Sequence, residues 1–269
     1  MKDFTFVLIS CGELAEEKCL KAIQPFRDEI ELIEIRNVFP QIKMLNQMVE
    51  SVQSPYFIPL DADICLYEDA WDRIMNAWRK HWRNPNWHSI LFSLWDTLTE
   101  RKILALKILR TEIIKQFPFQ ESATPDVEHF QRLTKAGFTC IQDYLRLRPI
   151  GDHVVAGKQF CYFKYRDVYQ TYRAHNFDWD SAVFMGGDTL REKAKNHFDF
   201  FLYKLTMTKN SDYLNCIAGM MDGILSEAKN QSKTLEKQEY LVETKDAMDT
   251  FFKWYLEEEP LKHPEALLF

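Results

Sequence analysis

The sequence predicts an α/β protein with helices flanking a sheet and a helical extension at the C-terminal end. Strand-like and helix-like segments alternate in the order strand, helix, strand, helix, strand over the first 65 residues. This order favours a parallel sheet with right-handed crossovers, because a helix is the usual connection between parallel strands. Beyond about residue 203, glycine and proline become rare and the apolar spacing turns helical.

The first three strands are expected at 4–10, 31–38 and 55–60. Residues 4–10 and 55–60 are short apolar runs, and residues 31–38 alternate between apolar and polar side chains. A helix is expected at 13–26, where acidic residues crowd the first turn as helix N-termini favour. A second helix fits 41–53, because its apolar side chains share one face.

Further segments extend the same pattern. An aromatic helix is expected at 67–83, an apolar strand-like run at 89–95, and a strand that passes into a short helix at 104–117. Residues 127–136 have helical spacing, which Gly137 ends.

Length and composition set the broad class of protein. A chain of 269 residues with 46% apolar and 28% charged residues is expected to form one large or two small globular domains. We expect a main domain over 1–200 and a helical extension over 201–269. The net charge of −6 supplies no positive field that would attract a polyanion, so nucleic acid is not expected as a partner.

Membrane, metal-ribbon and secretion signals are missing from the sequence. No apolar run approaches the roughly 20 residues of a membrane-spanning helix, so no transmembrane segment is expected. The six cysteines contain no CxxC pair, which argues against a zinc ribbon or a thioredoxin-type motif. The apolar run near the N-terminus is too short for a signal peptide. We therefore expect a cytoplasmic protein, with peripheral membrane attachment left open.

Two carboxylates follow the third expected strand, in the sequence Asp61-Ala62-Asp63. Open α/β sheets bind ligands at the carboxyl ends of their strands. Carboxylate oxygens there can hold a hard divalent cation, Mg²⁺ or Mn²⁺, which neutralises a diphosphate and helps it to leave. The three residues alone fit a solvated turn or a helix cap equally well.

The stretch from Asn46 to Asp63 resembles the family-two nucleotide-sugar glycosyltransferases, in which an asparagine-bearing helix and a strand precede an Asp-x-Asp motif. Residues 4–23, 106–119 and 125–137 resemble further blocks of that family. The resemblance implies a GT-A-like, Rossmann-related sheet flanked by helices. It also implies metal-dependent transfer of a sugar from a nucleoside diphosphate sugar to a hydroxyl of a glycan or other acceptor.

The resemblance implies roles for two acidic residues of the 125–137 block. Asp126 matches the family's catalytic base, and Glu128 is the alternative base. Such a carboxylate removes the proton of the acceptor hydroxyl as that oxygen attacks, which inverts the anomeric centre. This chain departs from the family at Pro125, where the first acid of a pair is expected.

The metal and donor sites are also assigned by resemblance. His153 follows a turn signal and fits the order of a histidine that completes metal coordination beside Asp61 and Asp63. The second strand lacks the family's aspartate, so nucleoside binding departs from the pattern. The residues expected to contact the donor are Glu34, Arg36, Lys43, Asn46 and Asp61.

Tryptophans are candidates for stacking on sugar rings: Trp71, Trp78, Trp82, Trp87 and Trp95. The first three share one helical face and are expected to pack in the core. Trp87 follows Asn-Pro-Asn in what reads as a loop, and loops on a rigid scaffold often carry binding residues. We therefore expect Trp87 to bind the acceptor.

Two other functions stay open. One is a non-catalytic carbohydrate-binding or assembly protein on a degenerate transferase fold, which Pro125 and the missing second-strand aspartate favour. The other is a nucleotidyl or phosphoryl transferase that uses the same carboxylates. Such an enzyme normally needs a glycine-rich phosphate loop, and Cys11-Gly12 is a poor one.

Overall fold

A computed structural model describes residues 2–122, 124–174 and 190–225 of the chain. The chain divides into two compact units, residues 1–155 and 156–269. The expected boundary after residue 200 differs from this division and falls inside helix α7 (Leu190–Thr208). The part of the expected extension from residue 226 onward lies outside the described residues.

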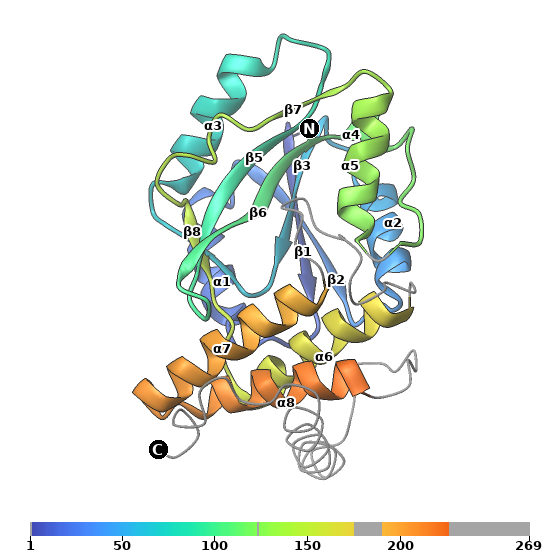
Figure 1. Cartoon of the computed structure of the whole chain (residues 1–269). Helices are drawn as coiled ribbons and strands as arrows, with labels where there is room; N and C mark the ends of the chain where they lie inside the picture. Colours follow the sequence, from blue (N-terminus) through green and yellow to red (C-terminus); the bar gives the residue numbers. More distant parts are fainter. Residues whose placement is uncertain (1, 123, 175–189, 226–269) are drawn as a thin grey trace. The chain divides into compact units, whose positions relative to one another are not determined.

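The first unit is built on one mixed sheet of eight strands in the order β2-β1-β3-β6-β5-β8-β4, with β7 paired to β5 (Figure 1). β1, β2 and β3 are parallel, as predicted. The sheet as a whole is mixed, because β6 runs antiparallel to β3 and β5, and a short turn suffices to join antiparallel neighbours. The strands are β1 (Phe4–Ser10), β2 (Ile30–Arg36), β3 (Tyr56–Asp61), β4 (Ile64–Leu66), β5 (Trp87–Asp96), β6 (Arg101–Arg110), β7 (Thr139–Ile141) and β8 (Gly151–His153).

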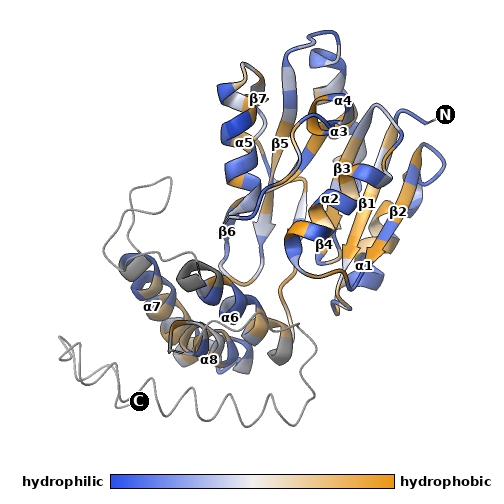
Figure 2. Ribbon diagram, turned by 90° about the vertical axis from the view of Figure 1, so that its right-hand side faces the viewer, coloured by the Kyte–Doolittle hydropathy of each residue, from blue (hydrophilic) through white to orange (hydrophobic). Residues whose placement is uncertain are grey.

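Helices cover both faces of this sheet, which confirms the predicted α/β class. Because side chains alternate along a strand, Phe6 and Leu8 of β1 pack with α1 and α3, whereas Val7 packs with α2, α4 and α5. The apolar residues concentrate in the parallel strands and on the helix sides turned toward them (Figure 2). The helices are α1 (Glu16–Ile23), the 3₁₀ turn η1 (Gln24–Phe26), α2 (Gln41–Ser51), α3 (Ala70–His81), α4 (Thr111–Ile114) and α5 (Pro125–Lys135).

The tryptophans of α3 confirm the predicted core position for two of three. Trp71 is buried and stacks on Phe26 at 5.2 Å between ring centroids. Trp78 is partly buried against the same core. The prediction is wrong for Trp82, which follows the last residue of α3, stacks on Trp78 and remains 42% exposed.

The second unit contains α6 (Lys158–Ala174), α7 and α8 (Ser211–Leu225). Two glycines allow α8 to touch the backbone of α6. A Cβ on Gly219 would lie 2.0 Å from the carbonyl oxygen of Tyr162, and one on Gly223 would lie 2.5 Å from that of Arg166. Among the described helices, none combines the length and the apolar character that crossing a bilayer requires.

Two buried histidines predict a loss of stability in mild acid. Burial lowers the pKa of both His88 and His129 to about 4, from 6.5 for an ordinary histidine. Below pH 6.5 these histidines therefore bind protons in the unfolded chain but not in the folded chain. The free energy of unfolding falls as pH drops toward 4. One such shift amounts to about 3 kcal/mol.

The variant His129→Gln tests this prediction, because an amide can replace the 2.7 Å hydrogen bond between His129 and the carbonyl oxygen of Phe117. Urea denaturation is measured at several pH values between 6.5 and 4. We expect the variant to lose less stability over this interval than the wild type. Parallel losses in the two proteins would show that His129 is not responsible.

Candidate active site

The acidic pair lies at the carboxyl end of β3, as predicted. Asp61 is the last residue of β3 and is exposed, whereas Asp63 lies half-buried in the turn before β4. Between them, Ala62 is fully buried and its N–H donates a 2.9 Å hydrogen bond to the carbonyl oxygen of Ile9. The turn is therefore attached to the end of β1.

Strand pairing brings His153 to Asp63. β4 and β8 are antiparallel, with Ile64 opposite His153. The Nε2 atom of His153 lies 3.1 Å from a carboxylate oxygen of Asp63, and the N–H of Val154 donates to the carbonyl oxygen of Asp63 at 2.7 Å. Two of the three metal ligands predicted from the sequence thus lie in contact.

The sequence does not predict Asp96, whose carboxylate is hydrogen-bonded to the other nitrogen of this imidazole. It ends β5, directly opposite His153 on β8, and its carboxylate lies 2.6 Å from His153 Nδ1. The N–H and hydroxyl of Thr99 donate to its second oxygen at 2.6 and 2.7 Å. A signal existed: like Asp61, Asp96 directly follows an apolar strand run.

The Asp96 carboxylate is buried yet stays charged. Burial acts to raise the pKa of Asp96, but the hydrogen bonds from His153 and Thr99 outweigh it and hold the pKa well below its ordinary value. With Nδ1 donating to Asp96, the imidazole is fixed in orientation and turns Nε2 toward Asp63. A carboxylate behind a histidine in this way is the usual support of a metal-binding imidazole.

The residues present fit a divalent cation that shares its coordination with a ligand. Among the described residues, no three His, Cys, Asp or Glu side chains form a group that could hold a metal ion by themselves. Asp63 and His153 offer one carboxylate and one imidazole, and Asp61 lies nearby in the chain. Mg²⁺ and Mn²⁺ at phosphate sites commonly take only a few protein ligands, with phosphate oxygens and water completing the set.

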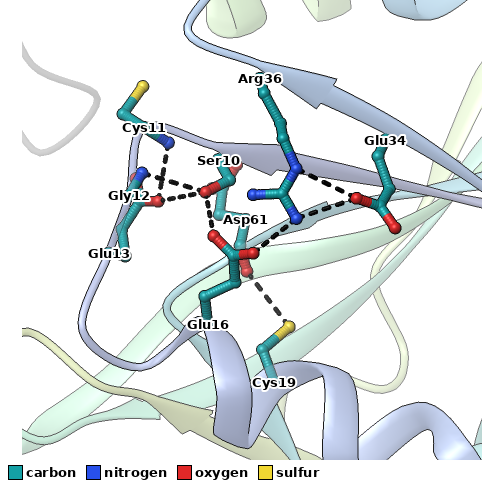
Figure 3. A network of polar contacts seen from close by, with 9 residues as sticks. All are labelled: Ser10, Cys11, Gly12, Glu13, Glu16, Cys19, Glu34, Arg36 and Asp61. Carbon is teal, nitrogen blue, oxygen red and sulfur yellow. Dashed lines mark hydrogen bonds and ion pairs between the residues drawn. The ribbon is translucent and has the colours of Figure 1, made fainter.

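A charged network occupies the neighbouring ends of β1 and β2 (Figure 3). The guanidinium of Arg36 lies 2.6 Å from the carboxylate of Glu16 and 2.8 Å from that of Glu34. The Ser10 hydroxyl contacts both Glu13, at 3.0 Å, and Glu16. Hydrogen bonds from Arg36 and Ser10 lower the pKa of Glu16. The network therefore keeps charges of both signs at this edge.

This network adjoins the acidic pair. The Cys19 thiol of α1 points to the backbone carbonyl of Asp61 at 3.8 Å (Figure 3). Glu34 and Arg36, two of the predicted donor contacts, thus lie at the same sheet edge as Asp61. Both side chains are 43% exposed, so a ligand can reach them.

The other predicted donor residues lie on α2. Lys43 is exposed. The Asn46 side chain instead forms two hydrogen bonds with the backbone of Phe119. Its amide donates to the carbonyl oxygen of Phe119 at 3.1 Å and accepts from the N–H of Phe119 at 2.9 Å. The Asn46 side chain therefore fixes the segment that precedes α5.

The two candidate bases lie in the first turn of α5. Asp126 is 57% exposed and lies 3.9 Å from the ammonium of Lys107. Glu128 is half-buried and forms a 2.6 Å ion pair with Arg132. The catalytic roles of both carboxylates stay predictions.

The position of Trp87 differs from the expectation that it binds the acceptor. The Asn-Pro-Asn-Trp segment reads as a loop, but Trp87 begins β5, is fully buried and stacks on Tyr56 at 5.6 Å. Its indole N–H donates to the carbonyl oxygen of His81 at 2.8 Å. The aromatic face is thus used by the core and cannot bind an acceptor.

No family model and no curated protein matches this chain. Among solved structures, the mannosyltransferase PcManGT from Pyrobaculum calidifontis with GDP-Man and Mn²⁺ is 12% identical at a TM-score of 0.45, covering 93% of this chain and 87% of its own. TarS 1-349 from S. aureus is 10% identical at a TM-score of 0.42, and the match covers 96% of this chain and 92% of TarS 1-349. Glucosyl-3-phosphoglycerate synthase from Mycobacterium tuberculosis, with Mn²⁺ and UDP, is 9% identical at a TM-score of 0.45. That match covers 68% of this chain and 81% of the synthase. At these values the similarities establish no activity for this chain.

The support of His153 by Asp96 predicts a stability loss in the variant Asp96→Asn. An amide cannot replace the charged hydrogen bonds, and we expect the free energy of unfolding to fall by about 1.5–3 kcal/mol. Urea denaturation measures the difference. Asp72→Asn, an exposed aspartate on α3, is the matched control and should change stability by less than about 0.5 kcal/mol. Equal effects in the two variants would contradict the structural role of Asp96.

Proposed function

We propose that this chain is a GT-A-like glycosyltransferase that moves a sugar from a nucleoside diphosphate sugar to a hydroxyl acceptor. The observation that carries the proposal is the contact between Asp63 and His153, supported by Asp96, at the sheet edge where β1, β2 and β3 end. Open α/β sheets bind nucleotides at this edge. A carboxylate and an oriented imidazole there suit a cation that carries a diphosphate.

Asp63 and His153, together with Asp61, would hold Mn²⁺ or Mg²⁺. Such an ion neutralises the diphosphate and stabilises the departing charge. The protein's part is to keep its ligands in place. Asp96 fixes the imidazole through Nδ1, and the buried Ala62 fixes the turn that carries both aspartates.

The nucleoside is proposed to lie over the charged network at the ends of β1 and β2. Glu34 and Arg36 are exposed enough to accept from and donate to a base or ribose. Lys43, exposed on α2, is the proposed cation for the diphosphate. Asn46 contributes indirectly in this proposal, by holding the Phe119 segment.

The acceptor hydroxyl needs a base, because its pKa is far above neutral and its proton must leave as the oxygen attacks. Asp126 is the proposed base, since its carboxylate is exposed in the first turn of α5. Glu128 is the alternative, although Arg132 holds it in an ion pair. A single displacement of the diphosphate by the activated oxygen would invert the anomeric centre.

Thermal unfolding of the full chain with nucleoside diphosphates tests the proposal. UDP, GDP, ADP and CDP are each added with Mn²⁺ or with EDTA. We expect one diphosphate to raise Tm only with Mn²⁺, because a ligand at 100 times its Kd stabilises the native state by about 2.7 kcal/mol. The shift should vanish in Asp63→Asn.

Asp72→Asn is the matched control for this experiment, since its exposed carboxylate lies on α3 outside the proposed site. It should keep the full Mn²⁺-dependent shift. If no diphosphate stabilises the wild type under either condition, the proposed donor site is wrong.

A further inference from the structure

Two cysteines of the second unit lie together in the protein interior. Cys161 belongs to α6 and Cys216 to α8, and both side chains are fully buried. Their thiols are free and form a hydrogen bond with each other. We call these two residues the α6–α8 cysteine pair. Adjacent thiols can be oxidised to a disulfide, whereas a lone buried cysteine behaves as a small apolar side chain.

The helices that carry the pair cross with their backbones in contact. A Cβ on Gly219 would lie 2.0 Å from the carbonyl oxygen of Tyr162, the residue that follows Cys161. Helices that pack through ordinary side chains lie about 8–10 Å apart, axis to axis. The glycine allows a closer approach. A disulfide needs Cα atoms about 4.4–6.8 Å apart, and a close crossing favours that separation.

Contacts on both sides of the α6–α8 cysteine pair fix its position along the helices. On the N-terminal side, the N–H of Gly157, directly before α6, donates to the carboxylate of Asp212 at 3.2 Å. On the C-terminal side, the hydroxyl of Tyr162 donates to Asp222 at 2.8 Å. The two helices run in the same direction through these contacts, and the pair lies between them. The sulfur atoms can therefore be joined with little backbone movement.

Other cysteines of the chain have different partners. The Cys19 thiol points to the backbone carbonyl oxygen of Asp61, and the Cys140 sulfur accepts a 3.2 Å hydrogen bond from the hydroxyl of Ser89. These contacts join sulfur to oxygen. In the α6–α8 cysteine pair each thiol instead meets a second thiol, which is the partner that disulfide formation requires.

We propose that the α6–α8 cysteine pair is a modification site, which a hydroperoxide oxidises to an intrachain disulfide. The bond joins α6 to α8 covalently and encloses α7, which lies between them in the sequence. Such a cross-link restricts the unfolded chain, so the oxidised protein resists unfolding more than the reduced protein. The second unit thus responds to peroxide by a gain in stability.

The reaction uses one hydrogen peroxide molecule for each disulfide. One sulfur, as a thiolate, attacks a peroxide oxygen, so the O–O bond breaks and the leaving hydroxide takes up a proton to become water. The product is a sulfenic acid. The second thiol then attacks the sulfenic sulfur, the S–O bond breaks, and a second water leaves with the thiol proton. Two thiols are oxidised, and the peroxide is reduced to two waters.

We assign the first attack to Cys161. Burial and the hydrogen bond with Cys161 raise the pKa of the Cys216 thiol, so Cys216 keeps its proton until the second step. Cys161 lies in the first turn of α6, where the partial positive charge of a helix N-terminus favours an anion. Because both sulfurs are buried, the oxidant must be small and must enter when the helices open locally.

Peroxide treatment of the full chain tests the proposal. The protein is incubated with hydrogen peroxide, alkylated at its remaining thiols and digested for mass spectrometry. We expect a cross-linked peptide that contains Cys161 and Cys216, with both thiols of the pair lost at the same rate because one bond consumes both. Dithiothreitol should restore both thiols. The Tm of the oxidised protein should exceed that of the reduced protein.

Two variants separate this cross-link from other oxidation. Cys216→Ala should abolish both the cross-linked peptide and the rise in Tm. Cys65→Ala is the matched control, because Cys65 is half-buried on β4 of the first unit, and it should keep both. The Tm of each variant without peroxide reports whether the variant folds. The cross-linked peptide of the wild type needs no variant.

Three outcomes overturn the proposal. They are a pair that stays reduced while other cysteines are oxidised, a disulfide that joins other cysteines, and oxidation of Cys161 to a sulfinic acid without a cross-link. A cross-link that leaves Tm unchanged overturns the proposed gain in stability. None of these results depends on nucleotide binding, so they are independent of the proposed function.

Discussion

The close approach of β8 to β4 is the constraint on which the site depends. A Cβ on Gly151 would lie 2.7 Å from the backbone carbonyl oxygen of Cys65, so this position has no room for a side chain. With glycine there, three residues of β8 fit between β4 and β5. The last of them, His153, then meets Asp63 on one neighbour and Asp96 on the other.

The same pairing gives two neighbouring residues of β5 two different environments. Asp96 is enclosed by hydrogen bonds from Thr99 and His153. Trp95, one position earlier, is 39% exposed. Alternation of side chains along a strand thus gives two consecutive residues a buried and an exposed position.

Much of this fold follows from local patterns, and most of the site does not. Apolar periodicity predicts β1, β2, β3 and the helices between them, and a paired carboxylate motif predicts the position of Asp61 and Asp63. Strands of three residues, such as β4 and β8, are too short to show alternation. The contact of Asp96 with His153 requires the pairing of β5 with β8, which no local signal carries. The position of Trp87 is not predicted correctly, because its Asn-Pro-Asn approach resembles a loop, whereas pairing with Thr139 of β7 extends β5 to that residue.

Arg36, the proposed nucleoside contact, has different surroundings from His153, the proposed metal ligand. Its two carboxylate partners hold a side chain that is 43% exposed, and exposed ion pairs contribute only about 0–1 kcal/mol each. A ligand that takes over one of these contacts therefore meets little resistance. The buried Asp96–His153 contact cannot rearrange so freely, because removing one buried partner leaves the other buried without its charge partner. Under the proposed function, different nucleosides are accommodated at Arg36 while the proposed cation ligands keep their positions.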